Sequence, residues 1–279
     1  MSSRFVAGFH IEDALQATAA LGNQGMAVTL DSLGENVSSP DQARASGRIY
    51  TRLLDAIAQA HLNANVSLKL TQMGMDLGAD LAAEVVGGLV QRATQAGNFV
   101  RVDMEGTPYT QATIDLVRRL HAEPANRGHV GIVIQAYLRR SADDVATLLA
   151  DGIRIRLCKG AYKEPPELAF PDKKDVDANF VALTKTLLKS GVYHGIATHD
   201  EAMISATREF VRAENIDRGS FEFQMLYGVR RDLQRKLVQE GYKVRVYVPF
   251  GDEWYPYFMR RLAERPANVI FLAKNFFRN

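Results

Sequence analysis

Apolar residues follow two alternating patterns along this chain. Short apolar or alternating runs are typical of β-strands, and longer stretches with apolar residues every three or four positions are typical of amphipathic helices. Strands are predicted at residues 26–30, 65–70, 99–104, 130–135, 153–158, 194–198, 221–226 and 244–248. Helices are predicted at 11–21, after Ser39-Pro40, at 81–96, at 110–122, after the cap at 141–144, and at 177–189, 201–213, 230–240 and 254–264.

This order predicts the fold class. Eight strands that are each followed by a helix imply parallel strands joined by right-handed crossovers. A closed (β/α)8 barrel of the α/β class, forming a single domain, is the favoured arrangement, with an open doubly wound sheet as the alternative. No G-x-G-x-x-G segment follows a strand, which disfavours a Rossmann domain. We expect residues 1–25 to form a helical segment packed on a barrel of residues 26–279.

Composition narrows the class of protein. The 279 residues are 47% hydrophobic and 24% charged, with a net charge of +2 and no basic run, which argues against nucleic acid as a partner. Cys158 is the only cysteine, so an internal disulfide and a cysteine zinc site are excluded, and a reduced, cytoplasmic setting is expected. No apolar stretch approaches the roughly 18 residues of a membrane span.

Polar residues collect where the predicted strands end. In a barrel these carboxyl ends face one mouth, which is where such folds place their chemistry. The mouth would therefore receive cations, amides, a phenol and carboxylates. In chain order these residues are Asp31, Lys69, Asp103, Gln135, Arg156, Lys159, Thr198, His199, Asp200, Gln224 and Tyr247.

The last predicted helix adds further cations. Tyr257, Arg261 and Glu264 share a broad face with Arg260. Arg260 and Glu264 are spaced for a surface ion pair, but two adjacent arginines above a barrel mouth would also form a fork for a small carboxylate, completed by Lys69. A small carboxylic acid is thus the expected substrate. Arg156 and the segment 159–161 suit a larger ligand, because Gly160 allows its backbone to approach closely.

Several segments, in order, resemble the catalytic domain of the proline dehydrogenase family in its short bacterial monofunctional form. They cover the chain from about residue 10 to its end. The segments are Leu68-Lys69-Leu70, Arg101-Val102-Asp103-Met104-Glu105, Gln135-Ala136-Tyr137, Arg156-Leu157-Cys158-Lys159-Gly160-Ala161-Tyr162, Ala197-Thr198-His199, Phe221-Glu222-Phe223-Gln224-Met225-Leu226, Tyr247-Val248-Pro249 and Tyr257-Phe258-Met259-Arg260-Arg261-Leu262. The family fold is a distorted (β/α)8 barrel that holds FAD.

The resemblance implies roles for individual residues. Lys69, Arg260 and Arg261 would bind the proline carboxylate, and Tyr162, Leu226 and Tyr257 would pack on its ring. The implied catalytic residues are Asp103, in a polar network with Lys69 and Tyr247, and Arg156, near flavin N5. The implied cofactor-lining residues are Met104, Gln135, Arg156, Lys159, Gly160, Ala161, Thr198 and His199.

The implied reaction is oxidation of L-proline to 1-pyrroline-5-carboxylate. Hydride would pass to flavin N5, and electrons would pass to a membrane quinone, with peripheral contact at the inner membrane face. A separate pyrroline-5-carboxylate dehydrogenase would act next. Two departures from the family stand out: relatives usually carry more helical sequence before the first helix, and Lys163 replaces a tryptophan found in bifunctional relatives.

Other functions share parts of this pattern. A Schiff-base lyase, similar to an aldolase, would use Lys69 or Lys159 as nucleophile on a small carboxylate. A metal-dependent hydrolase would use His194, His199 and Asp200, but no usual ligand spacing supports it. A binding protein without catalysis would need the same cavity and no cofactor.

Overall fold

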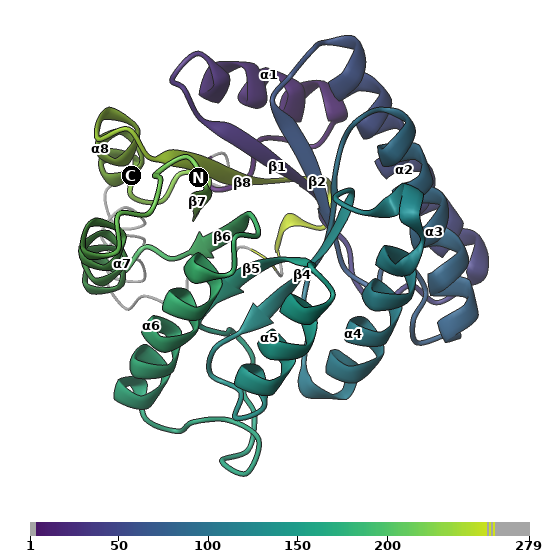
Figure 1. Ribbon diagram of the computed structural model, residues 1–279. Helices are drawn as coiled ribbons and strands as arrows, with labels where there is room; N and C mark the ends of the chain where they lie inside the picture. The colour runs from purple at the N-terminus through teal and green to yellow at the C-terminus, as the bar shows by residue number, and fades with distance from the viewer. Residues whose placement is uncertain (1–3, 256, 258, 260–279) are drawn as a thin grey trace, which may run out of the picture.

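The computed structural model of the chain describes residues 4–255, 257 and 259. Eight parallel strands form a closed barrel in chain order, and β8 pairs with β1 to complete it (Figure 1). The strands are β1 (Ala27–Ser32), β2 (Ala64–Leu68), β3 (Val100–Val102), β4 (Val130–Gln135), β5 (Arg154–Cys158), β6 (His194–Ala197), β7 (Phe221–Leu226) and β8 (Lys243–Phe250). The predicted (β/α)8 barrel is confirmed, and the open sheet is wrong.

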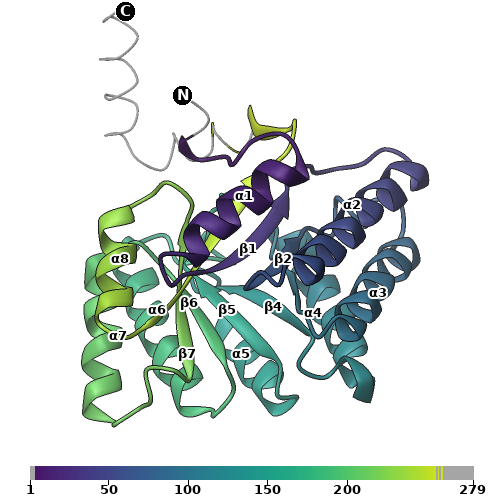
Figure 2. The same ribbon diagram turned by 90° about the horizontal axis from the view of Figure 1, so that it is seen from above.

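Helices surround the barrel in the same order (Figure 1). They are α1 (Ile11–Gly22), α2 (Pro40–Gln59), α3 (Ala79–Gln95), α4 (Thr107–Ala122), the short 3₁₀ helix η2 (Pro124–Asn126), α5 (Ser141–Ala150), α6 (Lys173–Lys189), α7 (Glu201–Ala213) and α8 (Arg231–Gln239). Helix α1 precedes the first strand and lies along β1 and β8 (Figure 2). The predicted helix at 254–264 lies mostly outside the described residues.

Helix starts depend on both local and distant contacts. Helix α2 begins where Ser39-Pro40 predicts, because Ser39 Oγ accepts a hydrogen bond from the Gln42 N–H at 3.3 Å. Helix α4 begins at Thr107, three residues before its predicted start, because a carboxylate from a distant loop caps it. Glu164 accepts from Thr107 N at 2.8 Å and from Thr107 Oγ1 at 2.6 Å. Such a cap cannot be read from the local sequence.

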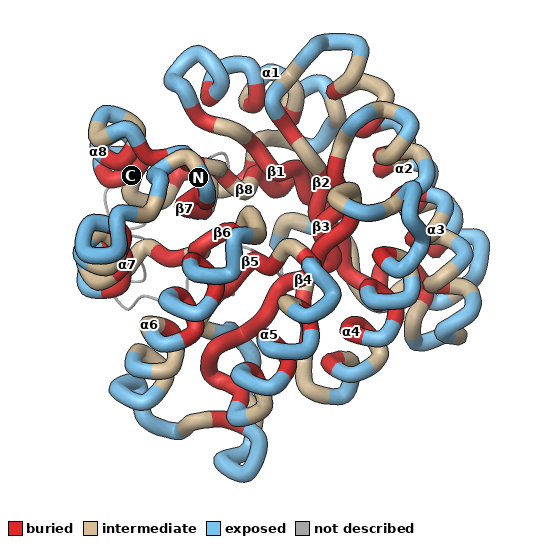
Figure 3. Tube along the Cα trace, viewed as in Figure 1, coloured by how far each residue is buried: buried red, intermediate tan, exposed pale blue. Residues whose placement is uncertain are grey.

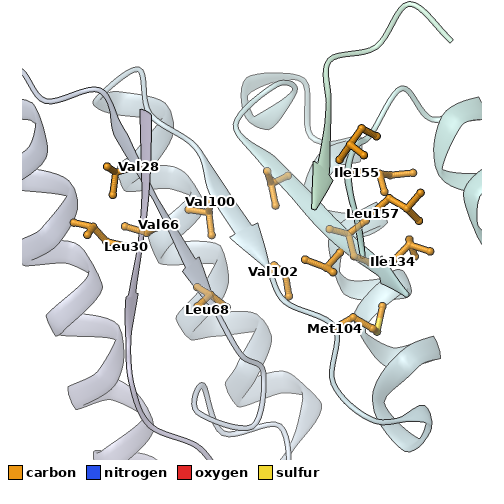
Figure 4. Packing of buried hydrophobic residues seen from close by; sticks show 14 of the residues in the cluster. Val28, Leu30, Val66, Leu68, Val100, Val102, Met104, Ile134, Ile155 and Leu157 are labelled. Atoms are coloured by element: carbon orange, nitrogen blue, oxygen red, sulfur yellow. The ribbon is translucent and has the colours of Figure 1, made fainter. Parts of the chain in front are cut away.

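The hydrophobic core lies between the barrel and its helices. Alternate residues of each strand point outward, so Val28 and Leu30 of β1 belong to one buried cluster with Leu53 and Leu54 of α2. Figure 4 shows members of this cluster from several strands packed together. Most strand residues are buried, whereas the helices expose one face (Figure 3).

The inside of the barrel is polar well below its mouth. The buried side chains of Arg101 on β3 and Glu222 on β7 and the half-buried side chain of Arg245 on β8 bond across the interior. Polar groups were expected only at the strand ends, so this charged interior was not predicted. These interior side chains matter for the site because they support the residues of the mouth from inside the barrel. Among the described residues, no helix combines the length and apolar character needed to cross a membrane.

Candidate active site

A continuous polar chain crosses the mouth of the barrel. Lys69 Nζ lies 3.1 Å from Oδ2 of Asp31 at the end of β1. The Tyr247 hydroxyl of β8 lies 2.6 Å from the same Asp31 oxygen and 2.9 Å from Oδ2 of Asp103. Arg156 Nη1 of β5 donates to Asp103 Oδ1 at 2.9 Å. Two cations, two carboxylates and a phenol are thus connected, as the strand-end pattern predicted.

Asp31 is the fully buried centre of this chain. Besides Lys69 and Tyr247, it accepts a hydrogen bond from the Tyr50 hydroxyl of α2 at 3.0 Å. Burial and the Asp31 carboxylate both raise the pKa of Tyr50 well above its usual value. A phenol kept neutral in this way is a permanent donor to Asp31. Tyr50 therefore fixes Asp31, which in turn fixes Lys69.

Lys69 is a fully charged ammonium. Burial lowers its pKa, but the Asp31, Asp103 and Glu35 carboxylates outweigh burial and raise the pKa above the usual lysine value. A Schiff-base nucleophile needs the opposite shift, because only the neutral amine attacks a carbonyl. Lys159 also lies in ion pairs, with Asp177 and, at 2.8 Å, with Asp200. The environments of both lysines disfavour the lyase alternative.

Arg156 is a buried guanidinium held on two of its three nitrogens. Nη1 donates to Asp103 and also to Ser67 Oγ at 3.1 Å, and Nε donates to Gln224 Oε1. The guanidinium carbon also lies 5.3 Å from the centre of the Tyr247 ring. Within the described part of the chain, no hydrogen bond engages Nη2. Among the described residues, the protein therefore holds two of the three guanidinium nitrogens of Arg156.

The loop after β5 contains several predicted cofactor residues. Gln135 joins two segments: its Nε2 donates to the Glu105 carbonyl at 2.9 Å, and its Oε1 accepts from Ala161 N at 3.4 Å. Gly160 has φ of +122°, and a Cβ there would lie 2.2 Å from the Tyr137 ring. The glycine thus makes room for Tyr137. Its predicted role in admitting a ligand to the backbone stays a prediction.

Thr198 and His199 follow β6, on the same side of the barrel. Thr198 N donates to the Gln224 carbonyl at 3.1 Å, and Thr198 Oγ1 accepts from Asp200 N at 3.1 Å. His199 Nε2 accepts the backbone N–H of Leu226 at 2.8 Å, so the proton of the neutral ring is on Nδ1. His194 Nδ1 accepts from Ile155 N at 3.0 Å. Both histidines thus use a ring nitrogen to bind backbone, which disfavours the hydrolase alternative.

The remaining predicted residues are placed as follows. Met104 is buried in the main core after β3, and Leu226 is half-buried at the end of β7, in register with Tyr247. Tyr257 is buried against Val6 and Leu33 near the end of β1. Tyr162, on the loop after β5, is 37% exposed. Arg260 and Arg261 lie outside the described residues.

Several residues of this network were missed as site residues. Asp31 and Gln224 were seen only as strand ends, and Ser67, Tyr50 and Glu222 were not singled out. The strict alternation Phe221-Glu222-Phe223-Gln224 carries the missing signal, because helices cover one face of β7 and its polar residues must then face the barrel interior.

The loop of residues 159–172 contacts the segment after β4 and the start of α4. Phe170 N donates to the Tyr137 carbonyl at 2.8 Å, and Arg139 N donates to the Leu168 carbonyl at 2.9 Å. The Glu164 cap on Thr107 fixes its other side. These contacts hold the predicted cofactor segment close to Gln135.

Comparison with known proteins assigns the family. The profile described as proline dehydrogenase matches residues 14–274. The chain belongs to the proline dehydrogenase family. It is 42% identical over 271 residues to proline dehydrogenase 1 of Bacillus subtilis, covering 97% of this chain and 89% of that protein. It is 43% identical over 279 residues to the proline dehydrogenase of Deinococcus radiodurans, covering 98% and 89%. The predicted family and class of oxidoreductase are confirmed.

The fold of this proline dehydrogenase family member is similar to that of a much longer protein. The proline utilization A (PutA) structure from Bdellovibrio bacteriovorus, inactivated by N-propargylglycine, superposes with a TM-score of 0.88 and 27% identity. The match covers 94% of this chain and 32% of that one. The chain therefore corresponds in fold to about a third of that PutA protein.

Proposed function

We propose that this enzyme oxidises L-proline to 1-pyrroline-5-carboxylate with FAD as its cofactor, passing hydride to flavin N5 and electrons on to a membrane quinone. Family membership supports the reaction. One structural observation carries the assignment: buried Arg156 keeps Nη2 available and is joined through Asp103, Tyr247 and Asp31 to Lys69 in the same mouth. A cation for a flavin and a cation for a carboxylate thus lie on one connected surface.

The residues present fit a flavin at the Arg156 end. When bound, FAD supplies the two-electron acceptor. A fixed guanidinium beside the ring stabilises negative charge that builds on reduction, and its burial strengthens that interaction. Gln135, Lys159, Gly160, Ala161, Thr198, His199 and Met104 are the proposed surroundings of the cofactor. Because Lys159 already binds Asp177 and Asp200, its proposed contribution is to hold the loop after β5.

The substrate is assigned to the Lys69 end. The Lys69 ammonium offers a charge for the proline carboxylate, and we assign Arg260 and Arg261 to the same carboxylate. Leu226, Tyr257 and Tyr162 are the proposed apolar walls for the pyrrolidine ring. Tyr247 and Asp103 lie between the two ends. They are placed to orient the ring nitrogen, whose lone pair must be free before the neighbouring C–H bond can break.

The proposed chemistry of the chain is therefore mainly positional. Asp103 holds Arg156 with one oxygen and Tyr247 with the other, so it links the cofactor side to the substrate side. Proline binds as an ammonium in neutral water, and its proton must leave before oxidation. We therefore propose that the reduction rate rises with pH from mildly acidic to mildly alkaline solution.

The direct test is the visible spectrum of the purified protein. A yellow flavin absorption that bleaches on anaerobic addition of L-proline is the expected result, with D-proline as the control. A colourless protein, or a flavin that proline leaves oxidised, would overturn the proposal. A lysine adduct trapped by borohydride would instead support the Schiff-base lyase alternative.

The partners follow from this chemistry. A quinone resides in the membrane, so we propose peripheral contact with the inner membrane face during reoxidation of the flavin. Reduction of a short-chain quinone by proline-reduced enzyme, measured with and without vesicles, tests this step. We also propose that a separate pyrroline-5-carboxylate dehydrogenase consumes the product.

A further inference from the structure

A second polar chain runs beneath Arg156, inside the barrel. Gln224 of β7 is buried, and its Oε1 accepts from Arg156 Nε while its Nε2 donates to Glu222 Oε1 at 2.5 Å. Glu222 Oε1 also accepts from Arg245 Nε at 2.7 Å, and Glu222 Oε2 accepts from the Tyr193 hydroxyl at 3.0 Å. Arg245 Nη1 donates to the Val28 carbonyl at 2.7 Å. Arg156 is thus tied to β1 through β7 and β8.

The amide of Gln224 can take only one orientation here. A guanidinium has donors only and a carboxylate has acceptors only, so the amide oxygen must face Arg156 and the amide nitrogen must face Glu222. Burial raises the pKa of Glu222, but the charge and hydrogen bond of Arg245 and the hydrogen bonds from Gln224 and Tyr193 together lower it below its usual value, so Glu222 remains an anion. This fixed anion keeps the amide oriented, and the amide oxygen then holds Arg156 Nε.

A glycine on the strand between Arg156 and Gln224 makes their contact possible. Strand β6 separates Arg156 on β5 from Gln224 on β7, and the β6 residue paired with both Arg156 and Glu222 is Gly195. A Cβ on Gly195 would lie 2.3 Å from Gln224 Nε2, well inside van der Waals contact. The glycine leaves the space through which Gln224 reaches across β6.

We propose that Gln224 and Glu222 are positioning residues for Arg156, in a space kept open by Gly195. They hold Nε, and Asp103 and Ser67 hold Nη1, so that Nη2 faces the cofactor at a fixed place. This inference rests on the proposed function, in which Arg156 stabilises the reduced flavin. Because the positioning acts through Arg156, its loss lowers the flavin potential and the reduction rate, while proline affinity, assigned to Lys69, changes little.

The first test replaces Gln224→Leu, which keeps the approximate volume and removes both polar atoms. We expect stoichiometric flavin, a reduction rate at saturating proline at least tenfold slower, and a proline dissociation constant within about twofold of wild type. Each tenfold loss in preference for reduced over oxidised flavin lowers the two-electron potential by about 30 mV.

Gly195→Ala should give the same slower reduction and lower potential as Gln224→Leu, with little change in proline affinity. Gly88→Ala, on an exposed position of α3 with no atom within 4 Å of its Cβ, is the matched control and should have the wild-type flavin potential and reduction rate.

A second variant separates positioning from folding. In Gln224→Glu, the introduced carboxyl still accepts from Arg156 Nε, but it bonds to Glu222 only when one proton is shared. The charged and titratable groups around this pair are Arg156, Arg245, Arg101, Tyr193 and, through Arg156, Asp103. The difference in potential from wild type should be small at low pH and grow as pH rises. This pH-dependent recovery is not expected if Gln224 only fills space.

The outcomes are distinct. If Gln224→Leu and Gly195→Ala bind flavin and keep the wild-type potential and rate, the inference is wrong while the proposed function stands. If proline does not reduce the flavin of the wild-type protein, the proposed function fails, and the inference fails with it. Should Gln224→Leu not fold, Gln224→Glu decides: a difference in potential that does not vary with pH overturns the positioning role.

Discussion

The Tyr247 hydroxyl lies 2.6 Å from Oδ2 of Asp31, which joins the last strand of the barrel to the first at the level of the site. The Tyr247 hydroxyl also lies 2.9 Å from Oδ2 of Asp103. Burial, and then the two carboxylates, raise the pKa of Tyr247 well above its usual value, so the phenol keeps its proton. A single proton serves one carboxylate at a time. The cations Lys69 and Arg156 on either side therefore compensate most of the remaining negative charge.

Removing that hydroxyl with Tyr247→Phe should destabilise the fold and weaken catalysis. Buried Asp31 and half-buried Asp103 lose a donor, and an unsatisfied group of this kind costs about 1–3 kcal/mol of unfolding free energy. Urea denaturation measures this cost, and kcat/KM for proline should fall in parallel. The control is Tyr109→Phe, which removes a hydroxyl bonded to Asp76 at the surface at 2.7 Å and should change stability by less than about 0.5 kcal/mol. Equal effects of the two changes would contradict this reading of the Tyr247 bridge.

Lys69→Met should be more damaging, because it leaves Asp31 charged and buried without its cation. Breaking such a buried pair from one side costs about 3–5 kcal/mol. Adding Asp31→Asn should recover part of the loss, since the unpaired charge is then gone. The double-mutant cycle, measured by denaturation, gives the coupling energy. A surface cycle on Arg44 and Glu84, with side chains 45% and 58% exposed, should give less than about 1 kcal/mol. Strict additivity at Lys69 and Asp31 is the result that would count against a buried ion pair.

His194 should make the fold sensitive to acid. Burial, followed by the Arg101 charge, lowers its pKa from 6.5 to about 3. Below pH 6.5 the unfolded chain takes up a proton that the folded protein still refuses, so stability falls as the pH falls. Between pH 6.5 and 5 this contribution reaches about 2 kcal/mol. A His194→Gln variant should therefore lose about 2 kcal/mol less than wild type between pH 7 and pH 5. Denaturation curves with the same pH dependence in both proteins would refute this assignment.

Two glycine substitutions should have effects of opposite sign. A Cβ on Gly131 of β4 would lie 2.4 Å from the Arg154 carbonyl oxygen and 2.7 Å from Arg101 Nη1, so Gly131→Ala should destabilise by about 1–3 kcal/mol or more. Gly88→Ala, with open space around its Cβ in α3, should instead stabilise by about 0.5–1 kcal/mol because alanine favours the helix. Thermal unfolding of both variants measures the difference. A neutral Gly131→Ala would mean that the backbone yields there at little cost.

The sequence could predict which strand ends meet, and therefore much of the site. Lys69, Asp103, Arg156 and Tyr247 were placed at one mouth because eight parallel strands end there, and their side chains do form one connected chain. That inference needs only the order of elements and the direction of each strand.

Contacts made across the barrel could not be predicted in this way. The bond between Gln224 and Arg156 depends on the relative register of three strands and on the absence of a side chain at Gly195. Lys159, which the sequence places at a strand end, is bound by Asp177 of α6 and by Asp200, the residue before α7. Neither fact appears in a local pattern, because both are set by how distant segments pack.

The charged interior has a consequence for how this barrel opens. Arg156 of β5 is bonded to Gln224 on β7, to Ser67 on β2 and to Asp103 after β3, and Arg245 of β8 is bonded to β7 and β1. If β5, β7 or β8 separated from the barrel, a charged side chain would lose a partner that stays on another strand, in an interior where unpaired charges are very costly. Amide hydrogen exchange in these strands should thus occur through one concerted event, with similar opening free energies from β1 to β8. The mouth therefore cannot open one strand at a time, because the ion pairs across it also hold the barrel closed.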